Sequence, residues 1–459
     1  MSHRFVHISD LHFGQEIHGT SPKHEAVRKA LLQDVKQLAE KRGAATRVLV
    51  TGDVAFSGKT EEFKVAAQWL DELTKACGCK ETDISMIPGN HDCDRKGISA
   101  IAKITYGHLR SGSAESAQAQ LHDIIKDGES TSPFLPKLQA YRKFASAYGC
   151  DFISAQKPFW IRELDLPSGV RLRLYGLTSV QVSNDEDALG KMLLGREQYT
   201  IEDEDDVITV VMLHHPLNWY IDKDEALDFL CNRARVIMTG HEHALNVHKT
   251  RDAMSGSEWL AIYAGATNPP ERELQFTYNW LELSCEEKNG VAHLVVETLP
   301  RVWVPGKTSF DADRNRIAGG AESIREEIAC PKVRMRADSG DIPNEAASAD
   351  TSVGSRSAEE SAVSPEGTEV TGEGGVSMVM NNADFDRLRY FFWRYLDWQQ
   401  RLKVLVLVDA LPKTADQPLP QTLERVALDT AAKDREKLHK LWDEIMPLIP
   451  VEKRGTNPF

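Results

Sequence analysis

Five short polar clusters each follow an apolar run of strand length, and this recurring arrangement limits the fold more than any other feature of the chain. Residues 5–10 and 47–53 contain two of these runs, and each ends in a carboxylate. Residues 22–42, between them, carry apolar side chains at helical spacing. A strand, a helix and a strand in this order form the unit of a parallel sheet. The clusters are Asp10-Leu11-His12, Gly52-Asp53, Gly89-Asn90-His91-Asp92, His214-His215 and Gly240-His241-Glu242-His243.

The same pattern continues over the first 300 residues and predicts an α/β fold. A second helix is expected over 60–77, and the next strand ends at Ile87. The carboxyl ends of the strands in an open α/β sheet face one crevice, so we expect the five clusters to meet there. Further strands are expected over 170–177, 207–213, 234–239 and 258–263, followed by a hairpin of 276–284 and 291–299.

The residue types in the clusters are those that hold divalent cations, which prefer carboxylate, imidazole and amide oxygen ligands. Asp10 and His12 alternate along the chain, so both can face one point, and Asp53 can give one carboxylate oxygen to each of two ions. Two ions roughly 3.5–4 Å apart would activate a hydroxide for in-line attack on phosphorus. The predicted metal ligands are Asp10, His12, Asp53, Asn90, His214, His241 and His243.

Four further residues are candidates for the reaction itself. The leaving oxygen needs a proton, and His91, next to the ligand Asn90, is the candidate general acid, with Asp92 orienting it. Asn184 and His215 are candidate substrate contacts, although a structural role is the alternative for both.

Length and composition divide the chain into three parts. A chain of 459 residues is too long for one ordinary core. Residues 337–377 contain nine acidic side chains, one basic side chain and no aromatic one, so we expect a disordered acidic linker over 336–380. It would join a domain of residues 1–335 to a helical domain of residues 381–459. Residues 95–150 have helical composition and are interpreted as a cap over the site, or alternatively as a peripheral helical insertion.

Composition also limits the cellular compartment and the kinds of partner that we expect for the protein. The apolar runs are too short for a membrane span, and the first strand begins too early to leave room for a secretory signal. The seven cysteines form no Cys-x-x-Cys pair, which favours a reducing cytoplasm. The net charge of −14 argues against a general binder of duplex nucleic acid.

The clusters resemble the five signature blocks of the calcineurin-like metallophosphoesterases, in particular of bacterial members, over roughly residues 4–300. The resemblance implies an αββα sandwich and two divalent ions, with manganese favoured and iron, zinc or nickel as alternatives. It also implies that His91 assists catalysis. By the same resemblance, Asp10, His12, Asp53 and His243 bind one ion, and Asp53, Asn90, His214 and His241 bind the other.

The C-terminal residues 381–450 resemble the small helical, death-like, effector-associated adaptor domains of bacterial conflict systems. That resemblance implies a protein partner or self-association, and ordinary helical packing is the alternative explanation of the apolar pattern. The linker would then let the catalytic part move relative to the adaptor.

These features predict a metal-dependent phosphoesterase that cleaves phosphodiester bonds in a nucleotide or nucleic acid. It would act as an effector, such as a nuclease, in a bacterial defence or signalling system. A cyclic-nucleotide phosphodiesterase or a phosphomonoesterase is the alternative within the same chemistry. The alternative from another class is an inert scaffold that acts through residues 381–459.

Overall fold

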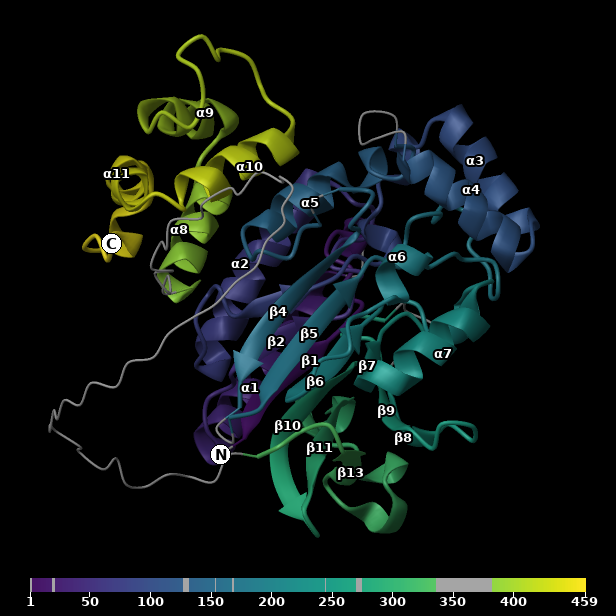
Figure 1. The fold of residues 1–459 in the computed structure, drawn as a ribbon. Helices are drawn as coiled ribbons and strands as arrows, with labels where there is room; N and C mark the ends of the chain where they lie inside the picture. Colours follow the sequence, from purple (N-terminus) through teal and green to yellow (C-terminus); the bar gives the residue numbers. More distant parts are fainter. Residues whose placement is uncertain are drawn as a thin grey trace, which may run out of the picture.

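Two mixed sheets packed face to face, with helices on both outer faces, form the main body of the protein (Figure 1). The computed structural model describes residues 2–18, 21–126, 132–152, 154–166, 169–243, 245–269, 275–335 and 382–459. The architecture confirms the predicted α/β sandwich. The predicted linker over 336–380 lies outside the described residues.

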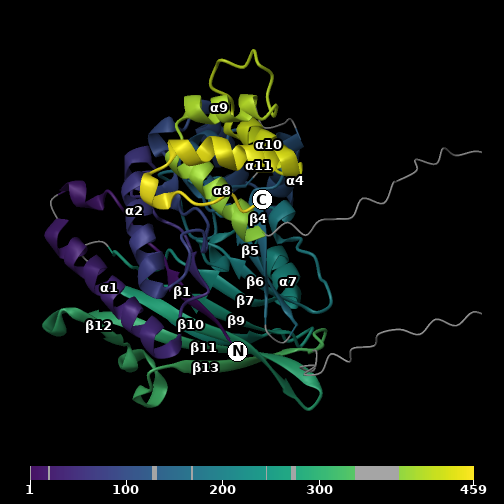
Figure 2. The same ribbon diagram turned by 90° about the vertical axis from the view of Figure 1, so that its left-hand side faces the viewer.

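The first sheet contains the three parallel strands that carry the first three clusters. Its order is β12-β11-β10-β1-β2-β3, with β13 paired to β11, and helices α1 (Ser21–Arg42) and α2 (Thr60–Cys77) cover its outer face (Figure 2). Strands β1, β2 and β3 run parallel, whereas β10 pairs antiparallel with β1. The strands are β1 (His3–Ile8), β2 (Arg47–Val50), β3 (Ile84–Met86), β10 (Thr277–Lys288), β11 (Val291–Val304), β12 (Ser309–Ala312) and β13 (Ile324–Cys330).

The second sheet carries the last two clusters and is covered by α6 (Arg196–Tyr199) and α7 (Lys223–Arg233). Its order is β4-β5-β6-β7-β9-β8, in which the four inner strands are parallel and the two edge strands antiparallel. Strands of the inner four are buried and apolar, which is why the sequence pattern predicts them. The strands are β4 (Phe159–Asp165), β5 (Arg171–Leu177), β6 (Val207–Met212), β7 (Ala234–Thr239), β8 (Asn246–Arg251) and β9 (Glu258–Tyr263).

The segment 95–150 is helical, as predicted, but its helices pack in two different places. Helices α3 (Ala100–Ser111) and α4 (Ala114–Lys126) join an apolar cluster with α7 beside the second sheet. Helix α5 (Gln139–Ser146) instead packs against α2 and the C-terminal helices. The segment is therefore a bridge between the second sheet and the C-terminal region.

The C-terminal region contains four α-helices, in the part of the chain where the sequence analysis expects a helical domain. Asp397 and Asp434 each mark the start of a new helix. The side chain of each accepts backbone N–H from the first turn and so acts as the N-cap. The helices are α8 (Asn382–Tyr395), α9 (Trp398–Leu407), α10 (Gln421–Ala431) and α11 (Arg435–Ile445).

These four helices are docked on the main body and share its apolar core. The Tyr390 hydroxyl donates to Asp71 Oδ1 at 2.8 Å, which joins α8 to α2. The Arg425 guanidinium lies 2.7 Å from Asp151 Oδ1 and joins α10 to the loop after α5. The free movement that the sequence analysis expects of a tethered domain is replaced by a packed interface. None of the described helices has the length and apolar character needed to cross a bilayer.

Candidate metal centre

The ends of five strands bring the polar clusters to one edge of the sandwich. Loops after β1 and β2 are tied together, because Asp10 N donates to Gly52 O at 3.1 Å and Leu11 N donates to Asp53 O at 2.8 Å. In the second sheet, Gly240 N donates to His214 O at 3.0 Å, which ties the loop after β7 to the loop after β6. Backbone hydrogen bonds therefore hold these loops in place relative to one another, independently of their side chains.

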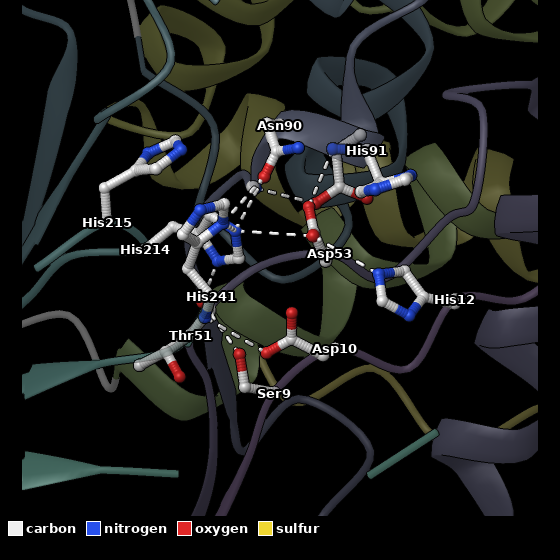
Figure 3. Close-up of polar contacts among 12 residues, drawn as sticks. Ser9, Asp10, His12, Thr51, Asp53, Asn90, His91, His214, His215 and His241 are labelled. Carbon is white, nitrogen blue, oxygen red and sulfur yellow. Dashed lines mark hydrogen bonds and ion pairs between the residues drawn. The ribbon is translucent and has the colours of Figure 1, made fainter. Parts of the chain in front are cut away.

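Asp53 lies at the middle of the site (Figure 3). Its Oδ2 is 3.3 Å from Nε2 of His12 on one side and 3.3 Å from Nε2 of His214 on the other. Its Oδ1 accepts the backbone N–H of His91 at 2.7 Å. Oδ2 of Asp53 therefore lies between histidines of the two sides of the site, and Oδ1 is held by the backbone.

The remaining predicted ligands divide between the two sides of Asp53. Asn90 Oδ1 is 3.0 Å from His214 Nε2 and 3.1 Å from His241 Nδ1. On the other side, His243 Nε2 is 3.3 Å from Asp10 Oδ1. The structure thus brings together all seven residues that the sequence analysis predicts as ligands.

Four sets of side chains each place their donor atoms within 4.8 Å of one another. Two carboxylates, Asp10 and Asp53, each belong to two of these sets, and the sets also overlap through shared histidines. Carboxylate and imidazole donors in two adjoining groups are consistent with two divalent ions. The sets are Asp10, His12 and His243; His12, Asp53 and His91; Asp10, Asp53 and His214; and His214, His215 and His241.

Main-chain carbonyls orient two of the ligand imidazole rings. His12 Nδ1 donates to Asn268 O at 3.2 Å, and His214 Nδ1 donates to Thr51 O at 2.8 Å. A carbonyl can only accept, so each Nδ1 carries a proton, and each Nε2 faces the carboxylates of the site, where it would offer its lone pair to a bound cation. These second contacts fix both ring orientation and tautomer, as is usual for metal-binding histidines.

Charge interactions in the site favour opposite protonation states for two neighbouring histidines. Burial lowers the pKa of His214, but the carboxylates of Asp53 and Asp10 outweigh it and raise that pKa to about 9. Burial, followed by the charge of His214, lowers the pKa of His241 to about 3. A positive charge between Asp53 and Asp10 is therefore stabilised, and a cation of higher charge would be stabilised in the same position.

The backbone of the site is held in an unfavourable conformation. Nine non-glycine residues of the described ranges have positive φ, and five of these nine are predicted ligands. Such strain costs about 1–3 kcal/mol at each residue and persists where the surrounding structure enforces it. The five φ angles are 55° for Asp10, 46° for His12, 55° for Asp53, 68° for His241 and 51° for His243.

Two glycines leave the space that the ligand side chains fill. A Cβ atom on Gly89 would lie 2.1 Å from Asp53 Oδ1, and one on Gly52 would lie 2.5 Å from His214 Nδ1. Both distances are shorter than any contact that real Cβ atoms make. The donor set and this close backbone approach together fit a pair of bound cations.

The position of Asp92 corrects one expectation. The sequence analysis assigns Asp92 to orienting His91, but its two carboxylate oxygens accept N–H groups from Ala55 at 2.7 Å and Gly89 at 2.9 Å. His91 Nδ1 donates instead to Phe56 O at 2.8 Å. Burial, and then the charge of Asp53, raise the pKa of Asp92 to about 7. Asp92 therefore ties two loops of the site together.

The two predicted substrate contacts have different positions. His215 is fully buried beside the site, with its ring centroid 4.3 Å from that of His241, and its Nε2 has no hydrogen-bond partner among the described residues. Asn184 is engaged elsewhere, because its Oδ1 accepts from Arg110 Nη1 at 2.6 Å and from Glu186 N at 2.8 Å. The structure brings His215 to the site and leaves Asn184 in a network with α3.

Three residues of the site are missing from the sequence analysis. Asn268 and Phe56 act through main-chain carbonyls, which every residue type has, so no residue pattern could reveal them. Trp219 is half-buried, lies 4.2 Å from the His241 ring centroid and donates from Nε1 to Glu242 Oε1 at 3.4 Å. Its position after His214-His215-Pro216 is the signal that could have found it.

Two family models match the chain. The model for calcineurin-like phosphoesterases matches residues 3–245, which include all five clusters. The model for the GTPase-associated adaptor domain matches residues 384–447, which include the four C-terminal helices almost completely. The second match shows that the C-terminal domain is an adaptor domain of this type, as the resemblance to adaptor domains implies.

Similar proteins include one curated sequence and several solved structures. An uncharacterized metallophosphoesterase-like protein of Bacillus subtilis (strain 168), YydB, is 30% identical over 95 residues, which are 21% of this chain and 18% of that protein. A 5'-nucleotidase precursor from Thermus thermophilus has 14% identity and a TM-score of 0.32, over 73% of this chain and 56% of that one. A predicted phosphoesterase from Streptococcus pneumoniae has 10% identity and a TM-score of 0.27, over 72% and 99%.

Proposed function

The chain belongs to the calcineurin-like phosphoesterase family, and on that basis we propose that it hydrolyses phosphodiester bonds in a nucleotide or nucleic-acid substrate. The observation that carries the proposal is the convergence of the six other predicted ligands around Asp53, which lies 3.3 Å from a histidine on each side. Two divalent ions held there would polarise the phosphoryl oxygens and lower the pKa of a water for in-line attack.

The protein's own residues have separate roles in this proposal. Asp53 is the bridging ligand, Asp10, His12 and His243 complete one side, and Asn90, His214 and His241 complete the other. We assign His91 as the general acid, because its Nδ1 is held by Phe56 O and its Nε2 is left for the leaving oxygen. His215 lines the site beside His241.

Two half-exposed aromatic rings support a substrate that contains bases. Phe56 stacks on His91 with 5.4 Å between ring centroids, and Trp219 packs on His241 on the other side of the cluster. Aromatic side chains that flank a phosphate site offer stacking surfaces to nucleobases. A substrate with a base on each side of the phosphate, which is a phosphodiester, would use both rings.

The first test combines metal analysis with a substrate panel. The purified protein should contain close to two divalent ions per chain, with manganese the expected activator and iron, zinc and nickel tested beside it. It should then cleave bis-p-nitrophenyl phosphate faster than p-nitrophenyl phosphate. Cyclic nucleotides, single-stranded DNA and duplex DNA assayed beside them locate the natural class. Preference for the monoester would overturn the diesterase assignment and leave the phosphoesterase assignment intact.

The role of His91 has a test of its own. Replacing His91 with Gln should lower turnover of a dinucleotide, whose alkoxide leaving group needs a proton, by about 10²–10⁴-fold. Turnover of bis-p-nitrophenyl phosphate should fall much less, because p-nitrophenolate leaves without protonation. His248→Gln on the exposed face of β8 is the matched control. Equal losses on both substrates would remove His91 from this role.

The adaptor domain supports the proposal of a protein partner. Its match to the GTPase-associated adaptor domain suggests a partner that contains or accompanies a GTPase, within a bacterial defence or signalling system. In that arrangement the chain is the effector, and recruitment brings a nuclease-like activity to its target.

An inert scaffold is the competing function from another class. All seven donor residues are present, whereas a scaffold has no need to keep them. Asp53→Asn should abolish turnover and release both ions while the fold remains, because an amide oxygen can still accept from His91 N. A cellular effect that survives this change would favour the scaffold.

A further inference from the structure

A second charged site lies between the main body and the adaptor domain. An open cavity of about 880 Å³ is lined by residues of β4 and the start of β2 on one side and of α8 and α10 on the other. Arg47 at this cavity begins β2, and Asp53 follows the end of the same strand. The two residues thus lie at opposite ends of β2, and none of the predicted metal ligands lines the cavity, so the cavity is separate from the metal centre.

The cavity is positive although the chain as a whole is strongly acidic. Seven cationic and five anionic side chains line it, whereas the chain carries a net charge of −14. Lys80, Lys157 and Lys433 line it without a carboxylate partner anywhere in the described part of the chain. Lys157 and Lys433 are exposed, so they stand at the mouth.

Three arginines form the inner wall of the cavity and are incompletely neutralised. Arg162 and Arg389 share one carboxylate, Asp386, which lies 3.2 Å from Arg162 Nη1. The Nε atoms of Arg47, Arg162 and Arg389 are buried and have no hydrogen-bond partner among the described residues. Burial, and then the neighbouring charge of Arg162, lower the pKa of Arg47 to about 10.

Two neighbours of the arginines show that the cluster is built into the fold. Burial raises the pKa of the Cys150 thiol, while the charges of Arg162, Arg47 and Arg389 act to lower it, so all three guanidiniums are near enough to act on this thiol. A Cβ atom on Gly149 would lie 2.3 Å from Arg389 Nη2, and Gly149 has a φ of +64°. The glycine therefore leaves the room that the Arg389 guanidinium occupies.

We propose that this cavity binds a small molecule that carries a phosphate or pyrophosphate group, with Arg47, Arg162 and Arg389 as the anion-binding residues and Lys157 and Lys433 at the entrance. Arg47 pairs with Asp83, and Arg162 and Arg389 share Asp386, so three guanidiniums have two carboxylate partners and an added anion would stabilise them. Planar guanidiniums bind phosphate oxygens in pairs. The volume is within the range of small-molecule sites. A ligand here would touch both the main body and the adaptor domain and would hold them together.

Titration calorimetry on the full chain tests this site with inorganic pyrophosphate as the probe. Arg389→Gln and Arg47→Gln should each weaken binding at least tenfold. The double change Lys157→Gln with Lys433→Gln, at exposed positions that do not support the fold, should weaken it severalfold. Arg196→Gln, an exposed arginine on α6 whose partner Glu225 also lies outside the cavity, is the matched control and should bind as the unmodified chain does.

The Asp53→Asn variant separates this site from the metal centre. Binding that survives in Asp53→Asn and is lost in Arg389→Gln supports the proposal. Binding that is lost in Asp53→Asn and survives in the arginine and lysine variants would assign the probe to the metal centre and overturn it. No binding by the unmodified chain at millimolar probe would also overturn it. ATP titrated into Asp53→Asn distinguishes the ligand's source, because tighter binding than pyrophosphate indicates a nucleotide and equal binding a free phosphate compound.

Discussion

Gly89 is the residue whose size most directly limits the metal centre. Gly89→Ala would place a Cβ atom 2.1 Å from Asp53 Oδ1, so the bridging carboxylate has to move. Because a displacement of about 1 Å can cost 10²-fold in rate, we expect a loss of that size in turnover of bis-p-nitrophenyl phosphate. Circular dichroism should show the fold retained.

Gly107→Ala is the matched control for this change. Gly107 lies inside α3, and nothing stands within 4 Å of a Cβ atom built there. Alanine should leave turnover unchanged and stabilise the chain by about 0.5–1 kcal/mol, since it replaces glycine in a helix. Full activity of Gly89→Ala would show that the site tolerates movement of Asp53.

At the residue scale, the sequence predicts which side chains converge at the strand ends, but it does not predict the main-chain contacts that orient them. Asp10, Asp53 and His214 are found because they follow apolar strands, and strand ends in such sheets converge. The orientation of His91 is predicted wrongly, because it depends on a main-chain carbonyl at Phe56 and not on the adjacent Asp92. Hydrogen bonds to main-chain atoms leave no mark in the residue pattern.

At the element scale, helix α11 tests how far local capping stabilises the adaptor domain. Asp434 accepts N–H groups from Glu436 and Lys437, and it ends the preceding α10. Asp434→Ala should destabilise the chain by about 1 kcal/mol, as loss of an N-cap usually does. Urea denaturation followed by tryptophan fluorescence measures this, since three of the nine tryptophans, Trp393, Trp398 and Trp442, lie in the adaptor domain. Asp416→Ala, in the exposed loop before α10, should change nothing, and equal behaviour of the two variants would contradict the capping argument.

The sequence pattern misses strands whose side chains are only partly buried. Strands β4 and β8 lie at the edges of the second sheet, where half of the side chains are in solvent, so their apolar pattern is weak. Helix α2 is predicted at its observed bounds, because Phe63, Leu70 and Leu73 mark one continuous buried face. An element with one continuous buried face can be predicted from the sequence, because its apolar residues recur at a regular spacing.

At the scale of the whole molecule, bound ions would hold the two sheets together. Asp10, Asp53 and Asn90 follow strands of the first sheet, whereas His214 and His241 follow strands of the second. Ions that bind only the folded state stabilise it by about 2.7 kcal/mol at a concentration 100 times Kd. EDTA should therefore lower the Tm of the unmodified chain by several degrees and leave that of Asp53→Asn unchanged. An EDTA effect of equal size in both would place the bound ions elsewhere.

The docking of the adaptor domain determines how a partner bound to it would affect the main body. Arg425 on α10 pairs with Asp151 of the main body, and the side chain of Asp151 is only 3% exposed. A packed contact of this kind transmits the position of a bound partner directly to the body, whereas a loose tether would only raise local concentration. The sequence could not predict the docking, because the two packed faces are far apart along the chain. Apolar side chains on each face are also expected from packing within its own domain.

A double-mutant cycle on this ion pair distinguishes docking from tethering. Arg425→Met and Asp151→Asn, alone and together, should give a coupling of about 1–3 kcal/mol in the free energy of unfolding, because contacting partners in a buried network are not additive. The exposed pair of Arg196 and Glu225, both within the main body, is the reference and should give less than about 1 kcal/mol. A tethered adaptor domain would leave Arg425 in water away from Asp151, and the coupling would then be zero within error. The measured coupling thus decides whether the catalytic and adaptor domains move as one body.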